Sequence, residues 1–180
     1  MVDHAMRNLP QMQYFELVMS RLKLALVILG LLVLAGIGAK SVRTMARANN
    51  PLQIGQCTWY AFERAHQFGW KIQFDHPYGR HARAWPDRVT NAELVQTPEV
   101  GSLMVLDAWE GNPYGHVAFV EQVADKDHWT VTHANMGVGQ ELLKIDGASI
   151  REAKVSRRGE LVGFEDGVPT LKLIGFLKRR

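Results

Sequence analysis

The chain has 180 residues, 47% of them apolar, which is enough for one compact domain with an appendage. Its net charge of +3 and isoelectric point near 9.1 suit an anionic surface but are too small to predict nucleic-acid binding. A single cysteine excludes an internal disulfide framework and a cysteine-based zinc site.

The N-terminal part of the chain carries a membrane signal. Residues 1–21 form a polar leader, and residues 22–39 are apolar except for Lys23. Such a segment, of about 16–18 apolar residues, is at the short end of what spans a bilayer. We therefore predict a transmembrane helix or signal anchor at residues 22–39, with a cleaved signal peptide or a buried core helix as alternatives. Basic residues flank both ends, so charge does not fix the orientation.

A linker at residues 40–50 then leads to a globular domain at residues 51–180. Three- and four-residue spacing of apolar side chains predicts a helix over residues 56–69, and residues 81–89 suggest a short helix interrupted at Pro86. Five segments then read as strands: residues 102–106, 116–123, 129–135, 155–158 and 171–177. A helix followed by antiparallel strands predicts an α+β domain, with most of the tryptophans in its core.

Two residues of this domain suggest nucleophilic catalysis. Cys57 lies at the start of the first predicted helix, and His116 opens a predicted strand directly after Gly115. A helix N-terminus and an adjacent imidazole both lower the pKa of a thiol, and both are available to Cys57. The order of cysteine, strand-borne histidine and a further polar residue is that of papain-type catalysis. The alternative for an isolated pair is a small buried cysteine and a structural histidine.

Several further segments of the domain carry motifs: residues 55–61, Trp85, residues 98–102, 115–121, 133–137 and 173–177. In this order they resemble the CHAP family, the cysteine- and histidine-dependent amidohydrolases and peptidases of bacterial cell-wall enzymes. The resemblance implies a papain-like CHAP fold, with N-terminal helices packed on an antiparallel β-sheet, here preceded by the transmembrane helix.

The resemblance also implies roles for individual residues. Cys57 is the nucleophile and His116 its general base. The third position, which orients the imidazole, falls on His133, where many family members carry glutamate. Asn135 lies two residues on and shares a strand face with His133, so either can reach His116; we favour His133. Gln56 is a candidate oxyanion donor beside the Cys57 backbone N–H, although it is equally well explained as an ordinary residue at a helix start.

Other residues carry weaker expectations. Trp109 and Tyr114, in the loop before His116, are candidates for a substrate groove. Glu121 lies five residues along the strand from His116, on the opposite face, and we interpret it as a structural or surface residue. We expect no metal and no cofactor, because the spacing of the remaining histidines matches no common ligand pattern: these include His66, His76 and His81.

These observations predict a membrane-anchored peptidoglycan amidohydrolase or endopeptidase. Its partners are peptidoglycan and, through residues 22–39, the membrane; nucleic acid is not expected. The catalytic domain should face the periplasm or cell wall of a bacterium. The alternative is an inactive CHAP-fold module that binds or organises the cell envelope.

Overall fold

A computed structural model describes residues 50–180, apart from residues 78–79, 146 and 166–169. The predicted leader, membrane segment and most of the linker therefore lie outside the described residues. Within the described part, no helix has the length and apolar character needed to cross a membrane. Residues 50–180 form one compact unit.

The helices precede the sheet in the chain, as predicted. Helix α2 (Cys57–Gln67) buries Ala61 and Ala65, which lie one turn apart on one face. A 3₁₀ turn, η1 (Ala82–Ala84), runs into the short helix α3 (Trp85–Arg88). Pro86 does not interrupt this second segment, contrary to the sequence prediction. It lies in the first turn of α3, where a missing N–H costs no hydrogen bond.

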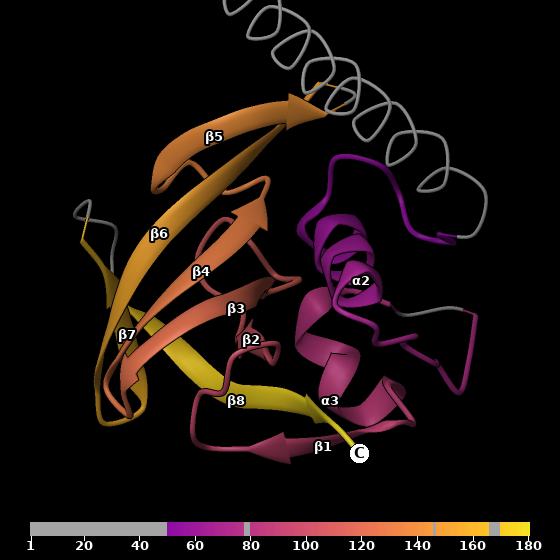
Figure 1. Cartoon of the computed structure of the whole chain (residues 1–180), viewed down its shortest axis with the longest axis horizontal. Coiled ribbons are helices and arrows are strands. Elements are labelled where there is room, and N and C mark those ends of the chain that lie inside the picture. The colour runs from indigo at the N-terminus through magenta and orange to yellow at the C-terminus, as the bar shows by residue number, and fades with distance from the viewer. Residues whose placement is uncertain (1–49, 78–79, 146, 166–169) are drawn as a thin grey trace, which may run out of the picture. The chain divides into compact units, whose positions relative to one another are not determined.

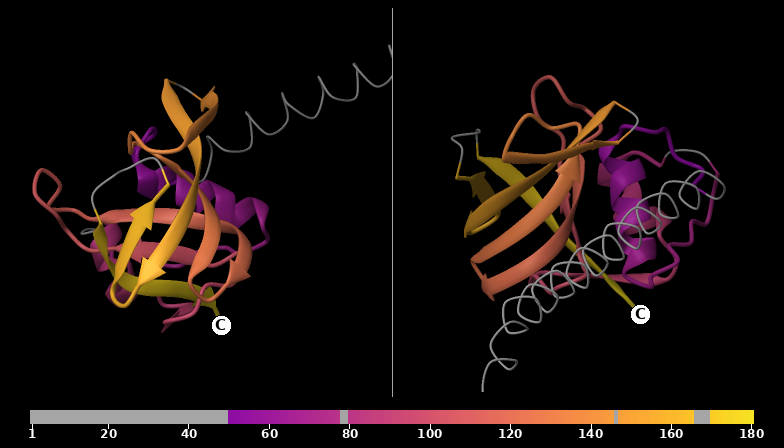
Figure 2. Two further views of the ribbon diagram at one scale, coloured as in Figure 1. Left: turned by 90° about the vertical axis from the view of Figure 1, so that its left-hand side faces the viewer. Right: turned by 45° about the horizontal axis from the view of Figure 1, so that its top comes forward.

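The described residues contain eight strands in one antiparallel sheet, and seven of them follow the order β1-β8-β2-β3-β4-β6-β5. Strand β7 pairs with both β6 and β8, so that six strands, β8-β2-β3-β4-β6-β7, close on themselves. The closed part forms a small barrel, and β1 and β5 extend it at two edges (Figures 1 and 2). The strand bounds are β1 (Ala92–Val95), β2 (Leu103–Leu106), β3 (His116–Asp125), β4 (His128–Ala134), β5 (Gln140–Ile145), β6 (Ala148–Arg158), β7 (Leu161–Phe164) and β8 (Leu171–Arg179).

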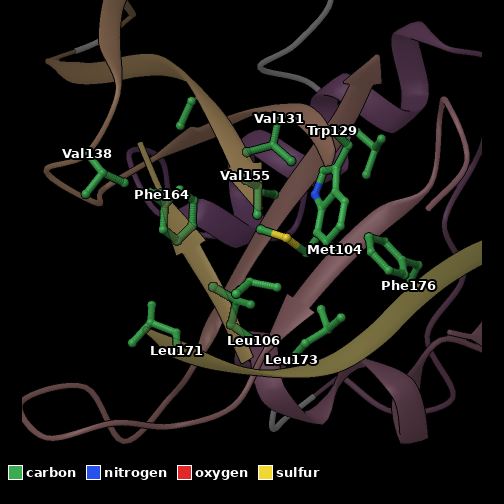
Figure 3. Packing of buried hydrophobic residues seen from close by; sticks show 14 residues of the cluster. Met104, Leu106, Trp129, Val131, Val138, Val155, Phe164, Leu171, Leu173 and Phe176 are labelled. Atoms are coloured by element: carbon green, nitrogen blue, oxygen red, sulfur yellow. The ribbon is translucent and has the colours of Figure 1, made fainter. Parts of the chain in front are cut away.

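The two faces of the closed sheet bury different clusters. Alternate side chains point into the barrel, where Met104, Trp129 and Phe176 belong to one apolar cluster (Figure 3). The side chains between them, such as Val105 and Phe119, point outward and form a second cluster with the helices. Figure 1 shows α2 and α3 together on this side of the sheet.

The predicted packing of helices on an antiparallel β-sheet is confirmed for the described residues, but these residues are mostly β, and part of the sheet closes into a barrel that the sequence analysis did not predict. The five predicted strands correspond to β2, β3, β4, β6 and β8. Four tryptophans are buried, as predicted, and Trp109 is half-buried. The sequence analysis missed β1, β5 and β7, and it placed the start of β6 seven residues too late.

Candidate active site

Cys57 is the first residue of α2, and its side chain lies against β3. Burial raises the pKa of the Cys57 thiol, while the nearby backbone N–H groups of Val117 and Thr58 lower it by less. The expectation of a lowered pKa was therefore wrong in direction. Burial of the sulfur outweighs the helix N-terminus, so the resting side chain is a neutral thiol.

His116 opens β3 immediately before Val117, whose N–H faces the Cys57 sulfur. The preceding residue, Gly115, has a φ of +70°, and a Cβ there would collide with the backbone oxygen of Leu106. Only glycine fits this close approach. The chain thus enters β3 with the His116 ring 2% exposed, on the same face as Leu106, its partner in β2.

The pKa of His116 lies well below its usual value, because burial disfavours the imidazolium and His133 adds a smaller repulsion. Its Nε2 atom is buried and makes no hydrogen bond to any residue that the structure describes. Cys57 and His116 are therefore a neutral thiol and a neutral imidazole in the resting protein. Such a pair suits general-base catalysis, in which the thiol loses its proton as it attacks.

The structure brings His133 to His116. The two ring centroids are 5.1 Å apart and the ring planes are nearly perpendicular, at 83°. Neither ring nitrogen of His133 forms a hydrogen bond within the described residues, although the backbone of Val138 lies close enough to affect its pKa. When His116 becomes protonated, its Nε2–H is a donor, and His133 is a neighbouring ring with unused acceptor capacity.

His133 lies inside the barrel, at the point where apolar side chains give way to polar ones. In β4 and β6, Trp129 pairs with Val155 and Val131 with Ala153, and the next interior pair is His133 with Arg151. Residues opposite each other share a face, so Arg151 lies beside the buried imidazole. Burial, followed by the Arg151 charge, lowers the pKa of His133 to about 4, and the Val138 backbone opposes this shift.

The lowered pKa of His133 predicts how the stability of the fold depends on pH. His133 has a pKa of about 4 when folded and about 6.5 when unfolded, so the unfolded chain binds more protons between these values. The stability that depends on a neutral His133 is present above pH 6.5 and is lost as pH falls to about 4. The loss amounts to about 3 kcal/mol for this residue. His133→Gln should remove that part of the acid-side loss in denaturant titrations at several pH values.

The exposed His128, on the same strand, supplies the matched control. His128→Gln should lose as much stability at acid pH as the natural protein. His133→Gln should still lose some stability, because His116 is also buried and has a lowered pKa. An unchanged pH dependence in His133→Gln would contradict the neutral, buried state of this ring.

Asn135 follows the end of β4 and does not share the environment of His133. It has a left-handed backbone, with φ of +58°, which asparagine tolerates better than most residues. Its side chain is exposed, and Nδ2 donates a hydrogen bond of 2.7 Å to Oε1 of Gln56. The geometry thus separates the two candidates: the His133 ring lies against His116, whereas the Asn135 side chain is hydrogen-bonded to Gln56, the residue before Cys57.

The two predicted groove residues have different settings. Trp109 is half-buried and packs against the interior cluster of the barrel. Tyr114 is 63% exposed, and its ring lies 5.8 Å from that of His81. Neither residue lines the pocket described below, and their role as a substrate groove stays a prediction.

Glu121 connects the element that carries Cys57 to the strands that carry the histidines. Its carboxylate accepts two hydrogen bonds from the Arg64 guanidinium of α2, at 2.8 and 2.7 Å, and one from the Thr132 hydroxyl of β4, at 2.6 Å. These contacts lower the pKa of Glu121 despite partial burial. The structural interpretation of Glu121 is confirmed, but its partners could not be read from the sequence.

A pocket of about 580 Å³ lies beside Gln56, the residue before Cys57. Its wall includes Gln56 and Asn135, joined by their hydrogen bond, and it extends to Arg151 on β6. The described residues that line it come from the turn before α2, the β4–β5 loop, the β5–β6 turn and the first part of β6: Gly55, Gln56, Asn135, Met136, Gly137, Gly147, Ala148, Ser149 and Arg151. Sequence analysis missed Arg151, because only the pairing of β4 with β6 places it here.

A family model described as "CHAP domain" matches residues 47–135, which include Cys57, His116 and His133. The chain has a CHAP domain. The matched residues contain α2 and the strands β1 to β4, so the match includes the candidate site except for the part of the pocket lined by residues after 135.

Curated relatives of the CHAP domain come from staphylococci. The chain is 37% identical over 87 residues to "Probable autolysin SsaALP" and 35% identical over 95 residues to "Probable autolysin LDP", both of Staphylococcus aureus. It is 35% identical over 92 residues to "N-acetylmuramoyl-L-alanine amidase sle1" of Staphylococcus epidermidis. These matches cover 47%, 52% and 46% of this chain but only 31%, 32% and 26% of the relatives. The chain therefore spans about a third or less of each of them.

Among solved structures, the crystal structure of Ly7917 with the hydrolyzing product of MDP superimposes with a TM-score of 0.49. The sequence identity is 15%, and the superposition covers 77% of this chain and 60% of the other.

Proposed function

We propose that this protein is a peptidoglycan hydrolase that cleaves an amide bond through the thiol of Cys57. The observation that carries the proposal is the junction of α2 and β3 inside the CHAP domain. There the Cys57 sulfur lies at a helix start, against the backbone N–H of the residue after His116. The relatives named as autolysins and amidases support peptidoglycan as the substrate.

The neutral site sets the order of the chemical steps. The Cys57 sulfur attacks the amide carbon while His116 accepts the thiol proton, and a tetrahedral oxyanion forms. The oxyanion lies beside the Cys57 backbone N–H, with the side-chain amide of Gln56 as a second donor. The carbon–nitrogen bond then breaks, His116 gives its proton to the leaving amine, and a thioester remains.

Hydrolysis of the thioester restores the enzyme. Water attacks the thioester carbon while His116 takes a proton from the water. The carbon–sulfur bond then breaks, and the Cys57 thiolate recovers a proton from His116. In both halves of the cycle His116 carries a positive charge for a short time. We assign His133 the role of holding the His116 ring, and Asn135 the role of holding Gln56 through their hydrogen bond.

We also propose that residues 22–39 anchor the protein in the membrane. The apolar stretch precedes the compact unit that begins at residue 50. An anchor there would hold the domain beside the cell wall, with the catalytic domain facing the periplasm or wall. This placement depends on the sequence pattern of residues 22–39.

Digestion of purified sacculi tests both parts of the proposal. The full chain in detergent and residues 48–180 without detergent should both release fragments, and mass analysis should show a new amine and a new carboxyl group at one kind of amide. The truncated chain should be soluble and folded, because every described core residue follows residue 50. Aggregation of residues 48–180 without native tryptophan fluorescence would mean that the apolar segment belongs to the core.

Two features of the site favour the alternative function, that of an inactive module that binds the cell envelope. The Cys57 pKa is raised, and Nε2 of His116 has no hydrogen bond within the described residues. Binding of sacculi without release of fragments, by a folded protein, would establish this second function in place of the first.

A further inference from the structure

The pocket beside Gln56 includes one positively charged and one hydroxyl side chain that the cleavage steps do not use. Its volume of about 580 Å³ is in the range of pockets that hold small ligands. Among the described residues that line it, Arg151 is the one that carries a charge, and Ser149 lies on the same face of β6, two residues away. A ligand that fills the pocket would therefore meet both Gln56 and a cation among the lining residues.

Arg151 is held in place but keeps donors for a ligand. One terminal nitrogen donates a hydrogen bond of 2.8 Å to the backbone oxygen of Gly139. The other lies 3.6 Å from a Glu141 carboxylate oxygen, too far for a hydrogen bond. A guanidinium has five N–H donors in a fixed plane, so one backbone contact leaves room for the two-pronged geometry that carboxylates match.

Glu141 is a weak competitor for Arg151. The side chain of Glu141 is 36% exposed and that of Arg151 28%, and ion pairs this accessible to solvent contribute little. A ligand carboxylate that enters the pocket can replace this long contact by two short, charge-assisted hydrogen bonds. The Glu141 carboxylate thus helps to orient the Arg151 guanidinium but leaves it able to bind a ligand.

We propose that Arg151 and the pocket between it and Gln56 form a subsite for a carboxylate group of the peptide substrate, next to the amide that Cys57 cleaves. This inference rests on the proposed function, because it takes the bound peptide to be the one that is cut. The carboxylate has two possible sources: an acidic residue within the peptide, or its C-terminus. The shared chemistry is recognition of a planar anion by a guanidinium.

Three synthetic stem-peptide fragments separate these sources. One carries an internal carboxylate and a C-terminal amide, one an internal carboxamide and a C-terminal carboxylate, and one is amidated at both places. With the full chain in detergent, we expect kcat/KM to be about 10- to 100-fold higher for one of the acidic fragments than for the doubly amidated one. Arg151→Gln should reduce this ratio to near one.

The ratio between fragments distinguishes recognition from a structural role. Arg151 also lowers the pKa of His133, so its replacement affects the site for every fragment. An effect through His133 or through folding lowers all three kcat/KM values together and leaves the ratio unchanged. Arg158→Gln, on the exposed far end of β6, is the matched control and should preserve both the activity and the ratio.

Glu141→Gln supplies a gain-of-function test. It removes the resident carboxylate from Arg151, so affinity for the favoured acidic fragment should increase, whereas affinity for the amidated fragment should not. A purely structural Arg151 predicts no such selective gain. Equal kcat/KM values for acidic and amidated fragments in the natural protein would overturn the subsite.

Binding to the full-length Cys57→Ala chain separates this inference from the proposed function, because it needs no turnover. Calorimetric binding of an acidic fragment that Arg151→Gln abolishes would support the subsite even if sacculi were not cleaved. Cleavage of sacculi with no preference for a carboxylate, in turnover or in binding, would leave the proposed function standing and overturn the subsite.

Discussion

Cys57→Ala is expected to lower the rate of amide cleavage by about three or more orders of magnitude, because it removes the atom that forms the thioester. His116→Ala should be nearly as damaging, since the resting thiol is neutral and cannot attack well without a base. The double variant should be little slower than either single variant, because nucleophile and base act as a unit. Release of amino groups from sacculi over time measures all three rates.

These variants must keep the fold for the rates to be informative. Cys57 is a half-buried residue at the edge of the outer cluster, so its replacement removes little packing. Tryptophan fluorescence and thermal unfolding should therefore match those of the natural protein, and Cys57→Ser provides an isosteric control. Substantial turnover by a folded Cys57→Ala protein would exclude thiol catalysis, and additive losses in the double variant would mean that the two residues act separately.

The sequence was sufficient to place Cys57 at the start of a helix and His116 at the start of a strand, because each position has a local signal. Gly115 permits the close backbone approach before His116, and Cys57 begins a helix whose apolar spacing is visible in the sequence. The pKa of the thiol was predicted in the wrong direction for a different reason. Helix position is a local property, whereas burial against β3 depends on the folded sheet and has the larger effect.

The missed strands share a physical cause. All of β5 except its last residue is exposed, so it lacks the alternation of buried and exposed residues by which a strand is recognised. Strands β1 and β7 have four residues each and, unlike the equally short but fully buried β2, include exposed residues, so they show no apolar run. The row of His133, Arg151 and Glu141 depends on pairing of β6 with β4 and of β5 with β6, and so could not be assembled from the chain order alone.

His133→Ala is expected to lower turnover by roughly ten- to a thousandfold, although the variant still contains both Cys57 and His116. The fully buried His133 ring packs 5.1 Å from that of His116, so its loss frees the base to rotate and removes its neighbour with acceptor capacity. His133→Gln, which retains an acceptor, should lose less. Steady-state rates on sacculi, with thermal unfolding to confirm the fold, measure these effects.

Two further variants decide which residue orients His116. Asn135→Ala should cost less than His133→Ala, because the Asn135 side chain is bonded to Gln56. His133→Glu should retain activity: Arg151 lies directly across on β6 and compensates the new negative charge, which in turn stabilises the His116 imidazolium. If Asn135→Ala is instead the more impaired variant, Asn135 is the orienting group and His133 a neighbour that fills the end of the barrel.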